Sequence, residues 1–417
     1  MSSPTHAERR ARATLTRIAE PGDVALAALV DEHGPEAVVD RLRSGQTFDR
    51  GRSGAWRVRL AGYDPDSDLE QADRVGGRLV CPGDAEWPET LDDLRPVLAL
   101  ERRPAGGRGS EQIRSGGSPL ALWVRGSVPL DEVCATSVAV VGSRAATAYG
   151  TEVAGDLGYA VADRGVTVVS GAAYGVDSAA HRGAIAAGAP TVAVLACGVD
   201  VSYPRGHASL LERMSETGLV ISEVPPGSTP NRIRFLIRNR LIAAMSRGTV
   251  VVEAALRSGA LNTARWANEL MRPVMGVPGP VTSALSAGVH QLLREGMAVP
   301  VTDADEVLET ISAIGENTLP MRHGESRPRD RLDELTLRVL EAVPAVRAVT
   351  SEGIARAAGL TVQDVGVRLG RLLLQDFVEQ RGDRWRLSAA ARGDAEWTAA
   401  WSAARDATTN TAEEANG

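Results

Sequence analysis

The sequence predicts an α/β protein whose centre is an extended, Rossmann-like parallel β-sheet with helices on both faces. Six short apolar runs, each followed by Gly, Ser or an acidic residue, alternate with helical stretches of about a dozen residues. Continuous apolar runs of this kind are typical of parallel strands that are buried on both faces. The predicted strands are residues 137–141, 166–169, 191–195, 219–221, 249–252 and 273–275.

The regions before and after the predicted sheet have helical patterns. Apolar residues recur at helical spacing up to about residue 75, with breaks at Pro21-Gly22 and Gly34-Pro35. After residue 331, two helical stretches precede a third that Thr361 opens, in a pattern that resembles a capping box with Asp364. A hairpin with a glycine turn follows at 377–387. Three helices and a small β-wing predict a winged helix.

These patterns divide the chain into regions. The predicted regions are a helical domain at 1–80, a connecting region at 81–130 with a flexible insert at 104–118, the sheet domain at 131–312, a linker at 313–330, the winged helix at 331–388 and a disordered tail at 389–417.

Composition limits the chemistry that the chain can offer. Of its 417 residues 43% are hydrophobic and only 4% aromatic, so the core must be aliphatic. The formal net charge of −7 argues against nucleic-acid binding through bulk positive charge, although a local patch would still allow it. All 46 basic residues are arginine. A lysine Schiff base and a P-loop lysine are therefore excluded, while the guanidinium fork still suits phosphate.

The cysteines and the hydropathy give a set of negative expectations. Cys81, Cys134 and Cys197 are far apart, and no CxxC motif or Cys/His cluster accompanies them. We therefore expect no zinc or other metal, no disulfide and no cofactor. The first residues are polar, and no apolar run of about 18 residues occurs. We expect no membrane span and a cytoplasmic location.

Small polar residues follow several predicted strands. Because carboxyl ends of parallel strands share one sheet edge, their backbone N–H groups and helix dipoles are suited to bind anions. An ordinary tight turn is the alternative at each position. The candidate anion-binding residues are Gly142, Ser143, Arg144, Ser170, Gly171, Ser258 and Gly259. The nearby Asp177 and His181 would make an acid–base pair, or would simply cap and pack.

Two further segments carry candidate ligand-binding side chains. Tyr203 and Arg205 would stack on a base and meet a phosphate, unless the loop is only a surface loop. Residues 225–247 contain five arginines and no acid, on a helix with apolar residues on nearly every side. Arginines on such a buried helix are costly unless they face an anion or pair internally with Glu223 or Glu253. The candidate residues on this helix are Arg238, Asn239 and Arg240.

The motifs occur in an order that resembles the DNA-processing protein A family (DprA, also called Smf). The matching blocks are Val141–Arg144, Ser170–Asp177 with Ala180-His181, Gly198–His207, Ser222–Gly227, Phe235–Arg240, Glu253–Ala264, Pro278-Gly279 and Gly288–Leu293. The resemblance is close over about residues 135–300. It departs at His207, Leu236, Asn262 and His290, where the family has other residues.

The resemblance implies a SAM-like helical domain, a Rossmann-like core and a winged helix. It also implies a homodimer that binds and protects single-stranded DNA, loads the RecA recombinase onto it, and serves natural transformation. The positions that match the family's strand contacts are Gly142, Ser143, Arg144, Ser170, Gly171, Arg205, Arg238 and Arg240. No catalytic residue is implied, and we expect no enzymatic activity.

Two other functions remain open at this point. A Rossmann-like nucleotide phosphoribohydrolase would use Glu253 or Asp177 at the sugar. A pure adaptor would recruit a partner through its winged helix, where Arg368 and Arg371 could meet DNA but acidic neighbours leave the face nearly neutral.

Overall fold

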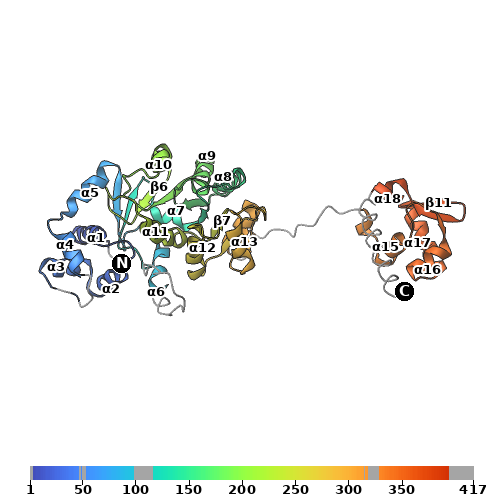
Figure 1. Cartoon of the computed structure of the whole chain (residues 1–417), viewed down its shortest axis with the longest axis horizontal. Coiled ribbons are helices and arrows are strands. Elements are labelled where there is room, and N and C mark those ends of the chain that lie inside the picture. Colours follow the sequence, from blue (N-terminus) through green and yellow to red (C-terminus); the bar gives the residue numbers. More distant parts are fainter. Residues whose placement is uncertain are drawn as a thin grey trace, which may run out of the picture. The chain divides into compact units, whose positions relative to one another are not determined.

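The computed structural model separates the chain into two compact units, residues 1–319 and 320–417, and Figure 1 shows both. The structure describes residues 3–46, 48, 53–97, 116–313, 315–317 and 328–393. Most of the predicted insert at 104–118, much of the linker at 313–330 and the tail from residue 394 onward lie outside the described residues. The predicted domain boundaries at 80 and 130 fall inside the first unit and stay predictions.

The first unit is organised around one large sheet. Within the described residues, nine strands pair in the order β1-β2-β6-β5-β4-β3-β7-β8-β9. All neighbours from β6 to β9 are parallel, whereas β1 with β2 and β2 with β6 are antiparallel. The strands are β1 (Gly77–Val80), β2 (Leu122–Arg125), β3 (Ser137–Val141), β4 (Thr167–Ser170), β5 (Thr191–Leu195), β6 (Leu219–Ser222), β7 (Thr249–Val251), β8 (Val274–Gly276) and β9 (Val299–Pro300).

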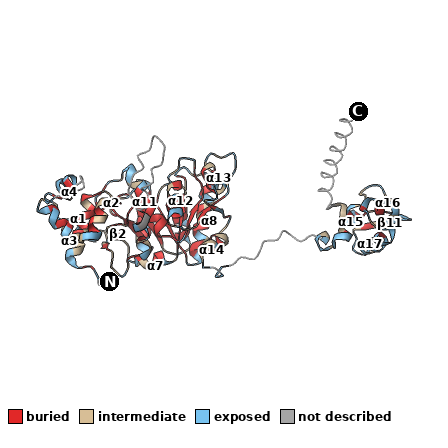
Figure 2. Cartoon of the chain, turned by 90° about the horizontal axis from the view of Figure 1, so that it is seen from below, coloured by how far each residue is buried: buried red, intermediate tan, exposed pale blue. Residues whose placement is uncertain are grey.

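The six predicted strands are confirmed as β3 to β8, each within one residue at either end. Alternate residues of these strands face opposite sides, as the period of two requires. Val138 and Val140 of β3 pack with α8 (Ala148–Asp163), α9 (Val176–Ala186) and α14 (Ala304–Ile311), while Ala139 and Val141 pack with α11 (Arg232–Ala244), α12 (Ala260–Glu269) and α13 (Ala287–Arg294). The buried residues in Figure 2 accordingly fill both sides of the sheet. The expected α/β class is confirmed.

The covering helices begin after the strand ends. Thr147 caps α8, because its side chain accepts a hydrogen bond from the Gly150 N–H, and Asn231 caps α11 by accepting from the Arg234 N–H. These helices and a short 3₁₀ turn are α7 (Leu130–Ala135), α8 (Ala148–Asp163), α9 (Val176–Ala186), η3 (Arg205–His207), α10 (Ala208–Thr217), α11 (Arg232–Ala244), α12 (Ala260–Glu269), α13 (Ala287–Arg294) and α14 (Ala304–Ile311).

Helices α8 and α9 approach each other closely because glycines line their contact. A Cβ atom at Gly158 would lie 2.4 Å from the Ala180 carbonyl oxygen, and one at Gly183 would lie 2.1 Å from the Gly155 oxygen. Real Cβ atoms do not come this near to backbone atoms. The two helix backbones are therefore in direct contact at this crossing. A larger residue at Gly158 or Gly183 would push the helices apart.

The N-terminal part of the first unit is helical, as predicted. Its helices break where the sequence indicated: α1 ends at Ile18 before Pro21-Gly22, and α3 begins at Pro35. Leu15, Ile18 and Trp56 belong to its own apolar cluster. The elements here are α1 (His6–Ile18), α2 (Val24–His33), α3 (Pro35–Arg43), α4 (Ser53–Leu60), α5 (Pro65–Arg74), η1 (Glu89–Leu91) and α6 (Leu94–Val97). Their assignment as a SAM-like domain stays a prediction.

Within the described residues, the second unit contains four α-helices and a small three-stranded sheet. Thr361 caps α17 by accepting from the Asp364 N–H, as the capping box predicted, and Gly359 ends α16 in the left-handed conformation at φ +64°. The elements are η4 (Pro328–Arg331), α15 (Glu334–Glu341), β10 (Val349–Thr350), α16 (Ser351–Ala358), α17 (Val362–Leu374), β11 (Val378–Arg381), β12 (Arg384–Leu387) and α18 (Ala389–Gly393). The predicted hairpin is β11–β12, with β10 added beside β12. The winged-helix assignment stays a prediction.

Nowhere in the described part of the chain does a helix combine the length and the apolar character that crossing a membrane requires.

Candidate nucleic-acid interface

The turn after β3 is tied to the neighbouring loops at the carboxyl edge of the sheet. The Ser143 N–H donates to the Glu253 carbonyl oxygen at 2.7 Å, and the Ser143 carbonyl accepts from the Val176 N–H at 3.2 Å. Gly142 is required here, because a Cβ atom would lie 2.5 Å from a methyl group of Val176. Arg144 follows this rigid turn and is exposed. The turn therefore presents the Arg144 guanidinium, but the Ser143 N–H is already engaged inside the protein.

The loop after β4 does not offer the anion-binding donors that its sequence suggested. The N–H groups of Gly171 and Ala173 donate to the Asp177 carboxylate at 3.2 and 3.4 Å. The Ser170 hydroxyl is fully buried and donates to the Val140 oxygen at 2.6 Å. The expectation that Ser170 and Gly171 bind an external phosphate is therefore wrong for the Gly171 N–H and the Ser170 hydroxyl, because an internal carboxylate and a carbonyl already occupy them.

Arg238 lies beneath this loop rather than on its surface. Its side chain, in a residue that is 6% exposed, donates to the Val194 carbonyl oxygen. Burial lowers the pKa of Arg238 to about 10, against the opposing attraction of Asp177, and burial raises the pKa of Asp177. A Cβ atom at Gly171 would lie 2.0 Å from the guanidinium. The expected contact of Arg238 with a strand is thus corrected to an internal role in which it supports the loop.

Arg240 is also internal, which corrects the expectation of a strand contact. The residue is 0% exposed, and its two terminal nitrogens each donate to a Glu223 carboxylate oxygen at 2.7 Å. Its Nε atom donates to the Gly117 carbonyl oxygen at 3.0 Å. The alternative of internal pairing with Glu223 is therefore the observed one, because a guanidinium enclosed in this way has no surface to present to a ligand.

Asn239 connects α11 to the last of the predicted turns. Its side-chain amide donates to the Gly259 carbonyl oxygen at 3.2 Å and to the Asn262 side chain at 3.3 Å. Asn239 is buried, so it positions this turn. Gly259 is exposed, and Ser258 is half-buried with its hydroxyl accepting from the Ala260 N–H. The Ser258-Gly259 turn stays a candidate for a strand contact.

Arginine and aromatic side chains do gather at the surface of this edge. The Arg144 guanidinium lies over the Phe235 ring, 4.8 Å from its centroid, and the Tyr203 ring lies 5.5 Å from the same ring. Arg205 and Tyr174 are exposed as well. We call these residues, Arg144, Tyr174, Tyr203, Arg205 and Phe235, the arginine–aromatic surface.

Two members of that surface were missed by sequence reasoning. Phe235 was counted among the apolar residues of a buried helix, but it is only half-buried, because the first turn of α11 projects from the core. Tyr174 is 50% exposed, and its ring contacts His207 edge-on at 4.5 Å. The signal that could have found both residues is the rarity of aromatic side chains, since the whole chain has three Phe and five Tyr.

The two histidines near this edge have structural roles. His207 is held by the Ala172 carbonyl at 3.0 Å. His181 contacts the Thr191 hydroxyl at 2.7 Å, and that hydroxyl already donates to Val168, so the imidazole is the donor. Burial lowers the pKa of His181 to about 3, which keeps it neutral. Asp177 bonds to loop amides instead, so the capping and packing interpretation applies rather than an acid–base pair.

Glu253 is likewise occupied. It is 1% exposed, and its carboxylate accepts from the Thr147 N–H at 2.9 Å and from the Thr147 hydroxyl at 2.7 Å. Because the carboxylate is buried and both of its oxygens hold the start of α8, it is not presented to a sugar, which counts against the phosphoribohydrolase alternative. No cluster of three or more His, Cys, Asp or Glu side chains that could hold a metal occurs in the described ranges.

The fold and the site thus define a Rossmann-like α/β protein with arginines and aromatic rings at the carboxyl edge of its sheet. Comparison with known proteins identifies the family within this class. The sequence profile of the DNA recombination-mediator protein A family matches residues 78–312, and the chain belongs to that family. DNA processing is the role that the family's members are named for.

Individual relatives cover much of the chain. A protein of Mycobacterium tuberculosis named for the DNA processing protein DprA is 47% identical over 391 residues, 93% of this chain and 96% of its own length. DNA processing protein DprA of Streptococcus pneumoniae is 39% identical over 46% of this chain and 66% of its own. The crystal structure of the Streptococcus pneumoniae protein superposes with a TM-score of 0.58 at 27% identity, over 74% of this chain and 98% of that one.

Proposed function

We propose that this protein binds single-stranded DNA along the carboxyl edge of its sheet and helps the RecA recombinase to assemble on the strand. The observation that carries the proposal is the arginine–aromatic surface, where Arg144 and Tyr203 lie against Phe235. In this proposal Arg144 and Arg205 pair with phosphates, while Phe235 and the two tyrosines stack on bases. The Ser258-Gly259 turn adds backbone contacts at the same edge.

The chemistry of this surface favours a single strand over a duplex. Aromatic side chains can stack only on bases that are unpaired and unstacked, and such stacking contributes about 1–3 kcal/mol per base. Bulk charge cannot supply the affinity, because the formal net charge is −7. Recognition would be largely independent of sequence, since phosphates and ring faces are common to all nucleotides.

The recombinase and dimer parts of the proposal rest on the family. Its name describes a recombination mediator, and the motif blocks of this chain match it over the sheet domain. In a homodimer, two arginine–aromatic surfaces would let one strand span both protomers. Protection of incoming DNA during natural transformation is the cellular role that this activity would serve, in the cytoplasm. The proposal includes no catalytic step, and nucleotide turnover by the purified protein would contradict it.

Fluorescence anisotropy with a labelled single strand and a matched duplex, measured across a salt series, tests the proposal. The single strand should bind more tightly, and log K should fall by about 0.7 per decade of salt for each phosphate neutralised. Arg144→Ala should lower both the affinity and the salt slope. Phe235→Ala should lower the affinity at an unchanged slope, because a ring contacts no phosphate.

Arg164→Ala is the matched control, because Arg164, a half-exposed arginine just after α8, pairs with Asp305 of α14 at 2.9 Å. It should leave binding unchanged. Absence of binding by the wild-type protein at low salt would refute the assignment. Equal effects of the Arg144 and Arg164 substitutions would refute the site.

A further inference from the structure

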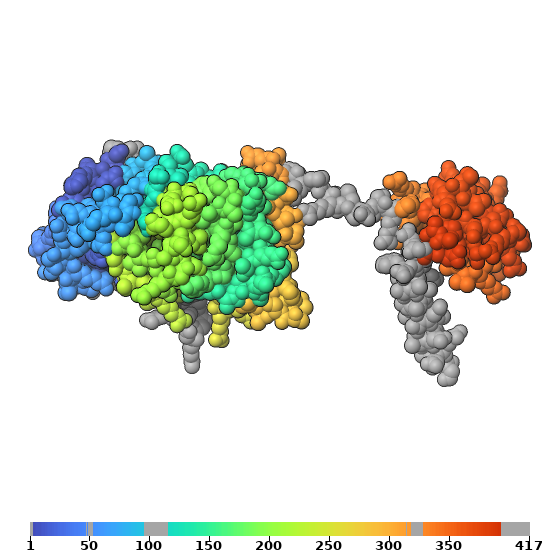
Figure 3. Space-filling model, turned by 90° about the horizontal axis from the view of Figure 1, so that it is seen from above, coloured from blue at the N-terminus to red at the C-terminus, as the bar shows by residue number. Residues whose placement is uncertain are grey.

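The segment that joins β6 to α11, residues 223–231, is held in place by the N-terminal helices. Arg17 of α1 donates from Nη2 to the Pro226 carbonyl oxygen at 2.8 Å. The same guanidinium is fixed by Asp68 of α5, with Nε and Oδ2 at 2.9 Å. In Figure 3 the blue N-terminal part of the first unit lies directly against the yellow-green part of the chain to which this segment belongs.

A second contact holds the tightest turn of the segment. The Asp200 carboxylate accepts from the Gly227 N–H at 2.8 Å, and Gly227 has a φ of +73° that favours glycine. Gln71 of α5 donates to the same carboxylate at 2.8 Å. The loop after β5, the turn at Gly227 and helix α5 therefore meet at one carboxylate.

A third contact reaches α11 itself. Glu20, just after α1, accepts two hydrogen bonds from Arg234 in the first turn of α11, at 2.8 and 3.1 Å. Arg234 also donates to the Thr229 carbonyl oxygen at 3.0 Å. Phe235, the aromatic centre of the arginine–aromatic surface, is the next residue.

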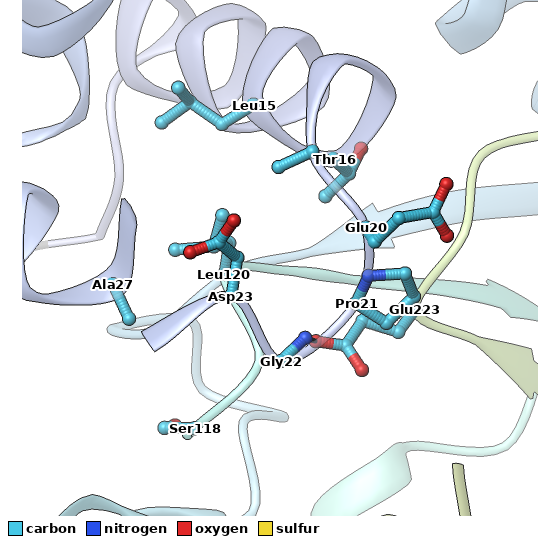
Figure 4. A pocket seen from close by; sticks show the side chains of 11 residues that line it. Leu15, Thr16, Glu20, Pro21, Gly22, Asp23, Ala27, Ser118, Leu120 and Glu223 are labelled. Carbon is cyan, nitrogen blue, oxygen red and sulfur yellow. Dashed lines mark hydrogen bonds between the residues drawn. The ribbon is translucent and has the colours of Figure 1, made fainter. Parts of the chain in front are cut away.

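The turn that carries Glu20 also contacts the sheet domain. The Gly22 N–H donates to the Glu223 carboxylate at 3.3 Å, and Figure 4 shows Gly22 beside Glu223, with Glu20 on the adjoining part of the turn. Glu223 is the partner of the buried Arg240 on α11. The N-terminal helices thus contact the segment before α11, the first turn of α11 and the ion pair behind it.

We propose that the N-terminal helices position α11. Glu20 acts most directly, because it pairs with Arg234 in the first turn of α11. They fix the first turn of that helix so that the Phe235 ring lies against both Arg144 and Tyr203. The inference rests on the proposed function, because it assigns these helices a part in strand binding without any contact to the strand.

Positioning and simple electrostatics predict effects of opposite sign for the Glu20→Gln variant. If Glu20 acted only as a negative charge near the strand, its removal would strengthen binding. If it positions α11, its removal weakens binding by about fivefold, the equivalent of a surface ion pair of about 1 kcal/mol. The salt slope stays unchanged, because no phosphate contact is lost.

The pair is tested by a double-mutant cycle. Glu20→Gln, Arg234→Gln and the double variant should bind with similar affinity, because each removes the same interaction. Asp305→Asn is the matched control, since it removes one half-exposed carboxylate that pairs with Arg164 elsewhere on this unit. It should bind as the wild type does. A salt slope that falls by about 0.7 in Arg234→Gln alone would assign Arg234 to a phosphate and overturn the positioning role.

Hydrogen exchange of the free protein gives a readout that does not depend on DNA. Amides of residues 228–238 should exchange faster in Glu20→Gln and in Gln71→Ala than in the wild type and Asp305→Asn, because local opening becomes easier. If exchange is unchanged and Glu20→Gln binds the strand as tightly as the wild type or more tightly, the inference is overturned. The proposed function is not affected by that result. Absence of strand binding by the wild type would instead overturn the proposed function, and the exchange result would still decide whether these helices fix α11.

Discussion

The sharpest consequence of the structure concerns the buried ion pair of Arg240 and Glu223. Glu223→Gln keeps the size and shape of the side chain but removes its charge. The Arg240 guanidinium then remains charged in a place where it is 0% exposed. Breaking a buried pair by removing one partner typically costs 3–5 kcal/mol, because the other charge is left uncompensated.

That cost is measurable by thermal unfolding. About 3–5 kcal/mol is a large part of a total stability of 5–15 kcal/mol. In a large unit, each kcal/mol lost lowers the unfolding midpoint by only about 2 °C. The midpoint of the first unit should therefore fall by roughly 6–10 °C. Scanning calorimetry of the full chain is the appropriate assay, since two compact units can give two transitions.

Glu212→Gln provides the comparison, because Glu212 is 58% exposed and pairs with Arg125. Its loss should cost less than about 1 kcal/mol. A midpoint for Glu223→Gln no lower than that of Glu212→Gln would refute the reasoning. Arg240 would then be free to meet a ligand, and Arg240→Gln should lower strand affinity and salt slope with little loss of stability.

Three further predictions follow from single residues. His181 has a pKa of about 3 in the folded chain against 6.5 when unfolded, so stability should fall as pH falls from 6.5 towards 3, by about 1.4 kcal/mol per unit; urea unfolding at pH 7 and 5 should show this slope reduced in His181→Asn, and equal slopes would contradict it. Gly158→Ala should destabilise the first unit by about 1–3 kcal/mol by separating α8 from α9, whereas Gly155→Ala, whose Cβ would lie 4.0 Å from its nearest neighbour, should not; similar chemical denaturation curves for the two variants would count against that close contact. Thr361→Ala should lower the stability of the second unit by about 1 kcal/mol, because it removes the cap of α17. An unchanged calorimetric transition of the second unit would show that the cap is dispensable.

The sheet was predictable because its strands are buried on both faces. Burial on both sides forces a continuous apolar run, and each of the six central strands has one. Sequence reasoning missed β1, β2 and β9; β2 is a buried apolar strand, whereas β1 and β9 lack that constraint. In β1, Arg78 interrupts a four-residue strand, and β9 is two exposed residues that include Pro300. Short edge strands are defined by their neighbours, which a single sequence does not show.

The site was predictable in place but less so in its individual contacts. The motifs lie at the carboxyl edge of the sheet, where Arg144 and Tyr203 contact one aromatic ring, and their role in strand binding stays a prediction. Arg238 and Arg240 look equivalent in the sequence, yet both turn inward, towards Val194 and Glu223. The choice depends on which buried acceptor each reaches, and those acceptors lie more than ten residues away. Asp177, by contrast, lies only six and four residues after the Gly171 and Ala173 N–H groups that donate to it.

The antiparallel pairing of β2 with β6 decides how the chain can be divided for experiments. β2 supplies partners to Val220, Ile221 and Ser222 of β6. A fragment that began at residue 131 would lack β2 and leave one edge of β6, a buried apolar strand, without a pairing partner, while β5 would still pair with its other edge. Exposed edges of that kind pair with other chains and aggregate. Such a fragment would fail in a binding assay for a reason unrelated to DNA, whereas a cut between residues 313 and 330 would separate the two compact units without opening the sheet.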